Sequence, residues 1–306
     1  MNGRAAWLGL LLLLCGLVGT LAAQFPPEPQ PTEERYNTLI ADLKATLGPS
    51  FTVHRVGMFV VAWDLNRDAG DQYEKLIPQV QEALYENFFA TRPDDVIRIA
   101  LFKDNASLRK NAKKLATKSP VMPGGGFYLP YEKVLCVETP MGEWLLKHEL
   151  THALLHADFR QRRLCPWFDE GMAMLVESAA INDKKIDLRL DWRLTLVQQQ
   201  WKAQKLPHLK DVFRMDFATY NSMSNRMIGD AMGRCFLMYL QEKGLLMTFY
   251  KRFRGNYSQD PTGIKFLEAI TKKKIDALET DWLAWVSEKT PNPAGDKPVP
   301  ANPPDQ

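Results

Sequence analysis

Apolar residues recur at strand and helix spacings along the first half of the chain, and the two spacings alternate. Runs rich in Val, Ile, Phe and Trp predict strands at 51–55, 58–63, 96–102 and 134–138, with a strand-like run at 127–129. Runs of period 3.6 predict helices at 32–47, 71–89 and 106–117. Because Pro78 interrupts the second run, it predicts a kink or two shorter helices there. Strands that alternate with helices indicate a small mixed sheet layer covered by helices.

The second half of the chain has a helical pattern almost throughout. Periodic apolar residues predict helices at 188–205, 224–243, 245–253, 263–270 and 275–288. The polar stretch 181–186 predicts a turn, and 211–220 shows no clear period. The many methionines and aromatic residues of this half are typical of a packed core. Together the two halves predict an α+β fold with a helical C-terminal half.

The most informative stretch is the nearly all-round apolar helix predicted over 144–156. It carries the motif His-Glu-Leu-Thr-His at 148–152, in a chain with only 5 histidines among 306 residues. Residues four apart lie on one face of a helix, so His148 and His152 can bind one metal ion. Glu149 lies beside the first of them, where a carboxylate can take a proton from water. This spacing is typical of a catalytic zinc site.

A catalytic zinc ion keeps three protein ligands and one open position, which calls for a third ligand here. Glu170 is the best candidate, since it lies in an apolar segment, 166–177, that predicts a second helix. The loop over 160–165 leaves room for that helix to pack against the first one. Two carboxylates near Glu170, Asp169 and Glu177, are candidates to hold the ligating imidazoles in one tautomer.

Two other residues compete with Glu170 for this role. His156 continues the histidine stripe, but it lies two turns, about 12 Å along the axis, from His148 and cannot share its metal ion. Asp158 occupies the place of the third ligand in some short-spaced zinc proteases. Those proteins need a glycine to bend the chain, and Leu155 stands at that position.

The motifs resemble those of a known enzyme family. The His-Glu-Leu-Thr-His stretch at 148–152, followed by Trp-Phe-Asp-Glu-Gly-Met-Ala at 167–173, is similar to the gluzincin zinc metallopeptidases, and most similar to the bacterial peptidase-MA-like proteins. Gly-Phe-Tyr at 126–128, ahead of Pro130, also resembles that group. The likeness extends loosely over 51–285 and is specific over 124–177.

This resemblance implies a zincin-like fold, in which a small sheet packs on the metal helix. It implies that His148, His152 and Glu170 bind Zn²⁺ and that Glu149 is the general base. The resemblance also predicts that the strand at 134–138, directly before the metal helix, is a sheet edge that pairs with an extended peptide.

The chain departs from the family at one position. Relatives place an oxyanion-stabilising tyrosine near the start of a later helix, whereas no tyrosine lies between Tyr220 and Tyr239. The chain also lacks the Gly-x-Met-Glu-Asn type of stretch with which related aminopeptidases bind a free amine. An endopeptidase is therefore the expected activity.

The two ends of the chain have non-globular patterns. Residues 1–23 combine a positive start, an apolar run and small residues, which predicts a secretory signal or an uncleaved membrane anchor. A Pro-rich linker at 24–31 and a Pro-rich disordered tail at 291–306 enclose the folded part. Within it we expect an α/β metal-site half at 32–180 and a helical half at 181–290. The protein is expected to be exported to the periplasm, the cell envelope or the medium.

Composition limits the partners. A net charge of +3 with scattered basic residues argues against binding to nucleic acid. Without Cys15 of the predicted signal, Cys136, Cys165 and Cys235 allow either one disulfide and a free thiol or three buried thiols. The sequence thus predicts an exported zinc peptidase that acts on peptides or proteins. The alternative is a zinc-binding domain of weak or no activity that binds peptides or envelope proteins.

Overall fold

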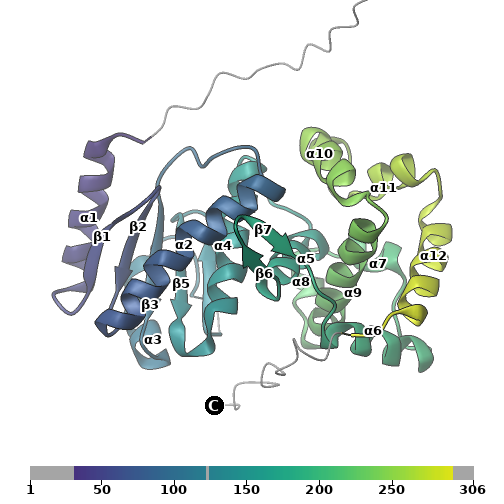
Figure 1. Ribbon diagram of the computed structural model, residues 1–306, viewed down its shortest axis with the longest axis horizontal. Helices are drawn as coiled ribbons and strands as arrows, with labels where there is room; N and C mark the ends of the chain where they lie inside the picture. The colour runs from purple at the N-terminus through teal and green to yellow at the C-terminus, as the bar shows by residue number, and fades with distance from the viewer. Residues whose placement is uncertain (1–30, 122–123, 292–306) are drawn as a thin grey trace, which may run out of the picture.

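The computed structural model of this chain describes residues 31–121 and 124–291. The predicted signal segment at 1–23 lies outside these residues, as do the predicted linker and tail apart from Pro31 and Pro291. The described part has the predicted α+β fold. A five-stranded mixed sheet with its helices lies at one end of the molecule, and a helical region lies at the other (Figure 1).

The sheet has the strand order β1-β2-β3-β5-β4. Its three central strands, β2, β3 and β5, run parallel, and the two outer strands are antiparallel to their neighbours. The strands are β1 (Thr52–Val56), β2 (Phe59–Trp63), β3 (Ile97–Phe102), β4 (Gly126–Leu129) and β5 (Val134–Glu138). Because every residue of β2 is buried, the sheet must be covered on both faces.

Helices cover the two faces of the sheet in pairs. Val60 and Ala62 of β2 point to one face and pack with α1 and α3, while the alternate residues Val61 and Trp63 point to the other face, toward α2 and α4. These helices are α1 (Glu33–Leu47), α2 (Arg67–Asn87), α3 (Asn105–Leu115) and α4 (Glu143–Asp158). The second face belongs to a larger apolar core that continues into the helical region.

The helical region packs against α4 through its first helix, α5. Its helices are α5 (Pro166–Glu177), α6 (Trp192–Lys202), α7 (Leu209–Arg214), α8 (Phe217–Tyr220), α9 (Met223–Glu242), α10 (Leu246–Asn256), α11 (Ile264–Thr271) and α12 (Ile275–Glu288). Single 3₁₀ turns occur at Thr139–Met141 and Tyr257–Gln259. Among the described helices, none is both long and apolar enough to cross a membrane.

The helices α5 and α9 cross at two glycines. A β-carbon on Gly233 would lie 2.4 Å from the backbone oxygen of Trp167, and one on Gly171 would lie 3.0 Å from the backbone carbon of Gly233. Only glycine permits backbones to approach this closely. The contact fixes α5, which carries Glu170, against the long helix α9.

The expectation that the strand at 134–138 forms the sheet edge is wrong. This strand, β5, lies between β3 and β4, and β4 is the edge. The chain leaves β3 through α3, returns as the short strand β4, and then fills the gap beside β3 with β5. The order of the strands depends on this long-range pairing, which cannot be predicted from the local pattern of apolar residues.

Two local predictions also need correction. The helix predicted at 71–89 begins at Arg67 and continues through Pro78, because Ile77 and Val80 on either side of the proline are fully buried in the core. The turn predicted at 181–186 is a hairpin of β6 (Ala180–Asn182) and β7 (Lys185–Asp187). Its turn residues, Asp183 and Lys184, have positive φ angles although neither is glycine. The sequence therefore lacks the glycine that usually indicates such a turn.

The three cysteines of the described region are free thiols. Cys136, Cys165 and Cys235 are all buried. Of the two arrangements that the sequence allows, the structure contains the one with three buried thiols.

Candidate metal centre

Helix α4 places two imidazoles side by side at its buried face. Leu146, Leu150 and Leu154 are fully buried and fix the orientation of the helix. His148 and His152, one turn apart, point the same way, and their Nε2 atoms lie 3.1 Å from each other. Each imidazole therefore offers one nitrogen to the same point in space.

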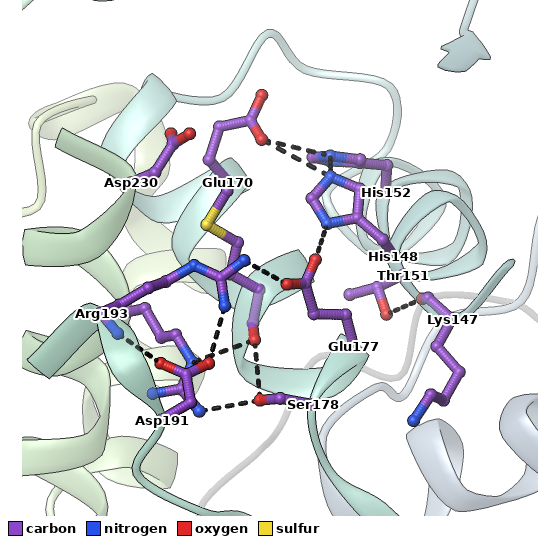
Figure 2. A network of polar contacts seen from close by, with 12 residues as sticks. Lys147, His148, Thr151, His152, Glu170, Glu177, Ser178, Asp191, Arg193 and Asp230 are labelled. Carbon is purple, nitrogen blue, oxygen red and sulfur yellow. Dashed lines mark hydrogen bonds and ion pairs between the residues drawn. The ribbon is translucent and has the colours of Figure 1, made fainter. Parts of the chain in front are cut away.

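Glu170 completes the group from the neighbouring helix α5. Its Oε2 lies 3.6 Å from Nε2 of His148 and 3.7 Å from Nε2 of His152. Figure 2 shows its carboxylate facing the two imidazoles. This oxygen is buried and has no hydrogen-bond partner among the described residues. A buried carboxylate oxygen without a partner is costly unless a cation neutralises it.

The donor set fits a zinc ion. Atoms bound at about 2.0–2.1 Å to one tetrahedral zinc ion lie about 3.3–3.4 Å apart, close to the separations in this group. Two imidazoles and one carboxylate are also the ligand types of a catalytic zinc site with an open fourth position. The structure thus brings the three predicted ligands, His148, His152 and Glu170, to one point.

A carboxylate lies against the outer nitrogen of each imidazole. Oε2 of Glu177 lies 2.7 Å from Nδ1 of His148, and Oδ1 of Asp169 lies 2.8 Å from Nδ1 of His152. A proton on each Nδ1 satisfies these contacts and leaves both Nε2 lone pairs free for a metal ion. Both residues come from α5, so this helix carries the candidate third ligand, Glu170, and both carboxylates that contact the imidazoles.

The support behind His148 continues to a buried arginine. Arg193 of α6 donates to the second oxygen of Glu177 and, at 2.7 Å, to Oδ2 of Asp191 (Figure 2). Arg234 of α9 lies 3.2 Å from the same Asp191 oxygen. The sequence did not predict this network, because an arginine that becomes buried in a helix has no local signature. Arg193 holds Glu177 in place and balances its charge.

Charge in this centre favours a cation. Burial opposes a charge on His148, but its contacts with Glu170 and Glu177 raise its pKa to about 9. For Glu170, burial acts to raise the pKa, yet the two imidazoles hold it well below its ordinary value. Asp169, also buried, has a lowered pKa beside His152 and His156. Three ionised carboxylates around two imidazoles attract positive charge.

Glu149 lies on α4 next to the first ligand. It is only 5% exposed, yet it lines the same cleft as the imidazoles. Burial raises the pKa of its carboxyl group above the ordinary value, against the influence of His148 and His152. A carboxylate of raised pKa beside a metal centre is suited to accept a proton from water.

The two rival residues occupy other places. Nε2 of His156 lies 2.9 Å from Oδ2 of Asp169, so Asp169 bridges His156 and His152. Asp158 is buried away from the ligands and accepts hydrogen bonds from the hydroxyl of Tyr250 and the guanidinium of Arg254. Asp158 therefore ties α4 to α10 and takes no part in the centre.

An open cleft of about 600 Å³ runs along the centre. The edge strand β4 lines it, as do the loop between α4 and α5 and the junction of α8 and α9. Tyr220, the last tyrosine before Tyr239, is fully buried and does not line this cleft. Arg226 of α9 does line it, with Nη2 4.0 Å from Oε1 of Glu170.

Comparisons with known proteins add no relative. No protein-family model matches the chain, and none of the curated proteins matches it. Its function must therefore be inferred from the chemistry of the site.

Proposed function

We propose that this chain is a zinc-dependent peptidase of the gluzincin type that hydrolyses internal peptide bonds. One observation carries the proposal: the Nε2 atoms of His148 and His152 and an unpaired carboxylate oxygen of Glu170 converge within 3.1–3.7 Å. The buried Glu149 beside them supplies the acid–base group that a purely structural zinc site does not need.

The roles follow from the positions of the side chains. A zinc ion held by His148, His152 and Glu170 supplies Lewis-acid activation of water and of the peptide carbonyl. The carboxylate of Glu149 accepts the proton of the attacking water and passes it to the nitrogen of the departing amine. Glu177 and Asp169 fix the two imidazoles in one tautomer.

Substrate orientation is assigned to the edge strand. β4 pairs with β5 on one side, and its residues line the cleft that also holds Glu149. The free edge of a strand offers N–H and C=O groups to an extended peptide. β4 thus takes the role that the sequence analysis gave to 134–138.

The zincin-like fold and an exported location belong to the same proposal. A sheet that packs on the metal helix α4, with α5 beside it, is consistent with a zincin-like arrangement. The apolar segment at 1–23 is consistent with export, or with an anchor in the membrane.

Metal content is the decisive test. The purified chain should contain one zinc ion, and a His152→Ala variant should lose it. A His208→Ala variant is the matched control, because that imidazole is exposed and contacts only Glu279 among the described residues. Absence of zinc from a folded wild-type chain after incubation with excess zinc would overturn the proposal.

A second candidate function is a zinc-binding domain that binds peptides without cleaving them. It is favoured by the lack of a tyrosine between Tyr220 and Tyr239, where gluzincin peptidases place an oxyanion-stabilising hydroxyl, and by the burial of Tyr220 away from the cleft. A Glu149→Gln variant separates the two. If the wild type cleaves a mixed peptide library and this variant does not, the chain is a peptidase. Binding without cleavage by either protein identifies the second function.

A further inference from the structure

The walls of the cleft outside the metal centre carry positive charge. Three arginines line it: Arg162 and Arg163 from the loop between α4 and α5, and Arg226 from the start of α9. The carboxylates that line the same cleft are Glu149, Asp169 and Glu170. All three of those belong to the centre itself, where the imidazoles and a metal ion balance them.

Two of these guanidinium groups have no carboxylate of the described residues within ion-pair distance, although the exposed Asp216 lies near enough to Arg163 to interact with it electrostatically. Within the described ranges, neither Arg162 nor Arg163 forms an ion pair, and both side chains are exposed. Arg163 is held in place instead by Phe217 of α8, whose ring centre lies 4.8 Å from its guanidinium carbon. This cation–π contact orients the group and leaves its N–H donors available to a ligand.

Arg226 forms two long ion pairs, with Glu170 and with Asp230. Its nearest carboxylate atoms, on Glu170 and Asp230, lie 4.0 and 3.8 Å away, which exceeds hydrogen-bond distance. The side chain is 49% exposed. It stands in the first turn of α9, where the helix dipole disfavours a cation. Its ion pairs with Glu170 and Asp230 leave about half of the side chain exposed in the cleft, where an anionic group of a bound peptide can reach it.

We propose that Arg162, Arg163 and Arg226 make the cleft selective for peptides with acidic side chains near the cleaved bond. This inference rests on the proposed peptidase function and adds its substrate class. A free C-terminal carboxylate provides only one anion, whereas these arginines lie on two separate elements of the cleft wall, the loop between α4 and α5 and the start of α9. Aspartate or glutamate side chains at more than one position along an extended peptide match them better.

Binding to an inactive chain tests this directly. The Glu149→Gln chain, loaded with zinc, is titrated with a labelled peptide that contains glutamates and with its glutamine counterpart, both amidated at the C-terminus. The glutamate peptide should bind roughly tenfold more tightly. Raising the salt concentration from about 0.05 M to about 0.5 M should weaken the binding of the glutamate peptide but not that of the glutamine peptide, because the difference in affinity is electrostatic.

Variants assign the preference to the cleft. In the same background, Arg162→Gln with Arg163→Gln, and separately Arg226→Gln, should each reduce the preference for the glutamate peptide. Arg252→Gln on α10 is the matched control, since this exposed arginine does not line the cleft. It should leave the preference unchanged.

Equal binding of the two peptides would overturn the inference, as would a preference that appears only with a free C-terminus. Tighter binding of a single-stranded oligonucleotide than of the glutamate peptide would overturn it too. If the chain prefers the glutamate peptide but the wild type cleaves neither peptide, the preference for acidic peptides stands and the peptidase function is rejected. Cleavage of both peptides at equal rates, unaffected by the arginine variants, would support the peptidase function and reject the preference for acidic peptides.

Discussion

Oε2 of Glu177 lies 2.7 Å from Nδ1 of His148, and both side chains are buried. The contact fixes the tautomer of the imidazole and turns its Nε2 toward Glu170. Arg193, on the other side of Glu177, holds that carboxylate in position. Glu177, two turns along α5 from Glu170, thereby orients a candidate metal ligand on the neighbouring helix α4.

The first prediction concerns this support. A Glu177→Gln substitution keeps the size of the side chain but removes the charge that strengthens the imidazole as a ligand. Zinc affinity should fall by roughly 10–100-fold. Competition with a chelator of known affinity measures this change. The matched control is Glu86→Gln on α2, whose side chain no ion pair or hydrogen bond ties to the centre. Unchanged affinity in Glu177→Gln would show that the contact does not tune the metal site.

The second prediction separates metal binding from proton transfer. Glu149 does not belong to the converging group of ligand atoms, so Glu149→Gln should retain one zinc ion per chain. Its rate of peptide cleavage should fall by roughly 10²–10⁴-fold, the usual contribution of a general base. The rate and the metal content are measured on the same sample. Loss of zinc together with the rate would assign Glu149 a different role.

The third prediction links the metal to stability. The buried Glu170 oxygen has no partner among the described residues, which makes the metal-free centre unfavourable, and the proposed zinc ion would bind only the folded chain. At a free zinc concentration about 100 times its dissociation constant, the free energy of unfolding should rise by about 2.7 kcal/mol. Denaturant unfolding with and without a chelator measures the gain. In His152→Ala the gain should vanish, and a gain of equal size there would place the stabilising metal elsewhere.

The convergence of the three candidate ligands could be predicted from the sequence because their pattern is local. His148 and His152 lie one turn apart on one apolar helix, and Glu170 lies in the next apolar segment. The α+β fold was predictable from the alternation of strand and helix spacings. Arg193 was not predictable, because its function depends on Glu177, which reaches it only after α5 and α6 have packed.

The edge of the sheet was not predictable for a similar reason. Both β4 and β5 are short apolar runs, and only their hydrogen-bonded partners determine which one is the outer strand. Arg226 likewise lies far along the chain from Arg162 and Arg163, and the fold brings all three to one cleft. Local patterns therefore locate the candidate metal-binding residues, while tertiary packing determines which residues line the cleft beside them.

The fourth prediction is a pH dependence. Arg35 of α1 donates to both carboxylate oxygens of Asp95, which precedes β3. Burial acts to raise the pKa of Asp95, but hydrogen bonds from Arg35 and from the backbone N–H of Val96 lower it below its ordinary value. A lowered pKa in the folded state stabilises the protein above the ordinary pKa, and this contribution is lost as pH falls through the folded-state value.

Asp95→Asn should therefore lower the free energy of unfolding near neutral pH and have little effect in acid. The loss should stay below about 1 kcal/mol, because both groups are partly exposed. Urea unfolding at a series of pH values measures it. Glu86→Gln, at an exposed position on α2, is the control. A loss that is as large in acid as at neutral pH would rule out the ion pair as its source.

The fifth prediction concerns the crossing that holds α5. In Gly233→Ala, the new β-carbon would lie 2.4 Å from the backbone oxygen of Trp167, so the two helices must move apart. Because Glu170 follows three residues after Trp167, the same movement shifts a metal ligand. The free energy of unfolding should fall by about 1–3 kcal/mol, the usual cost of overpacking. Zinc affinity should fall as well.

The matched control for Gly233→Ala is Gly255→Ala in α10. A β-carbon on Gly255 has no atom within 4 Å, and alanine favours a helix over glycine by about 1 kcal/mol. This variant should be as stable as the wild type or more stable, with unchanged zinc affinity. Denaturant unfolding and chelator competition on both variants measure the two effects. If Gly233→Ala lost stability but bound zinc as tightly as the wild type, the crossing would support the fold without positioning Glu170.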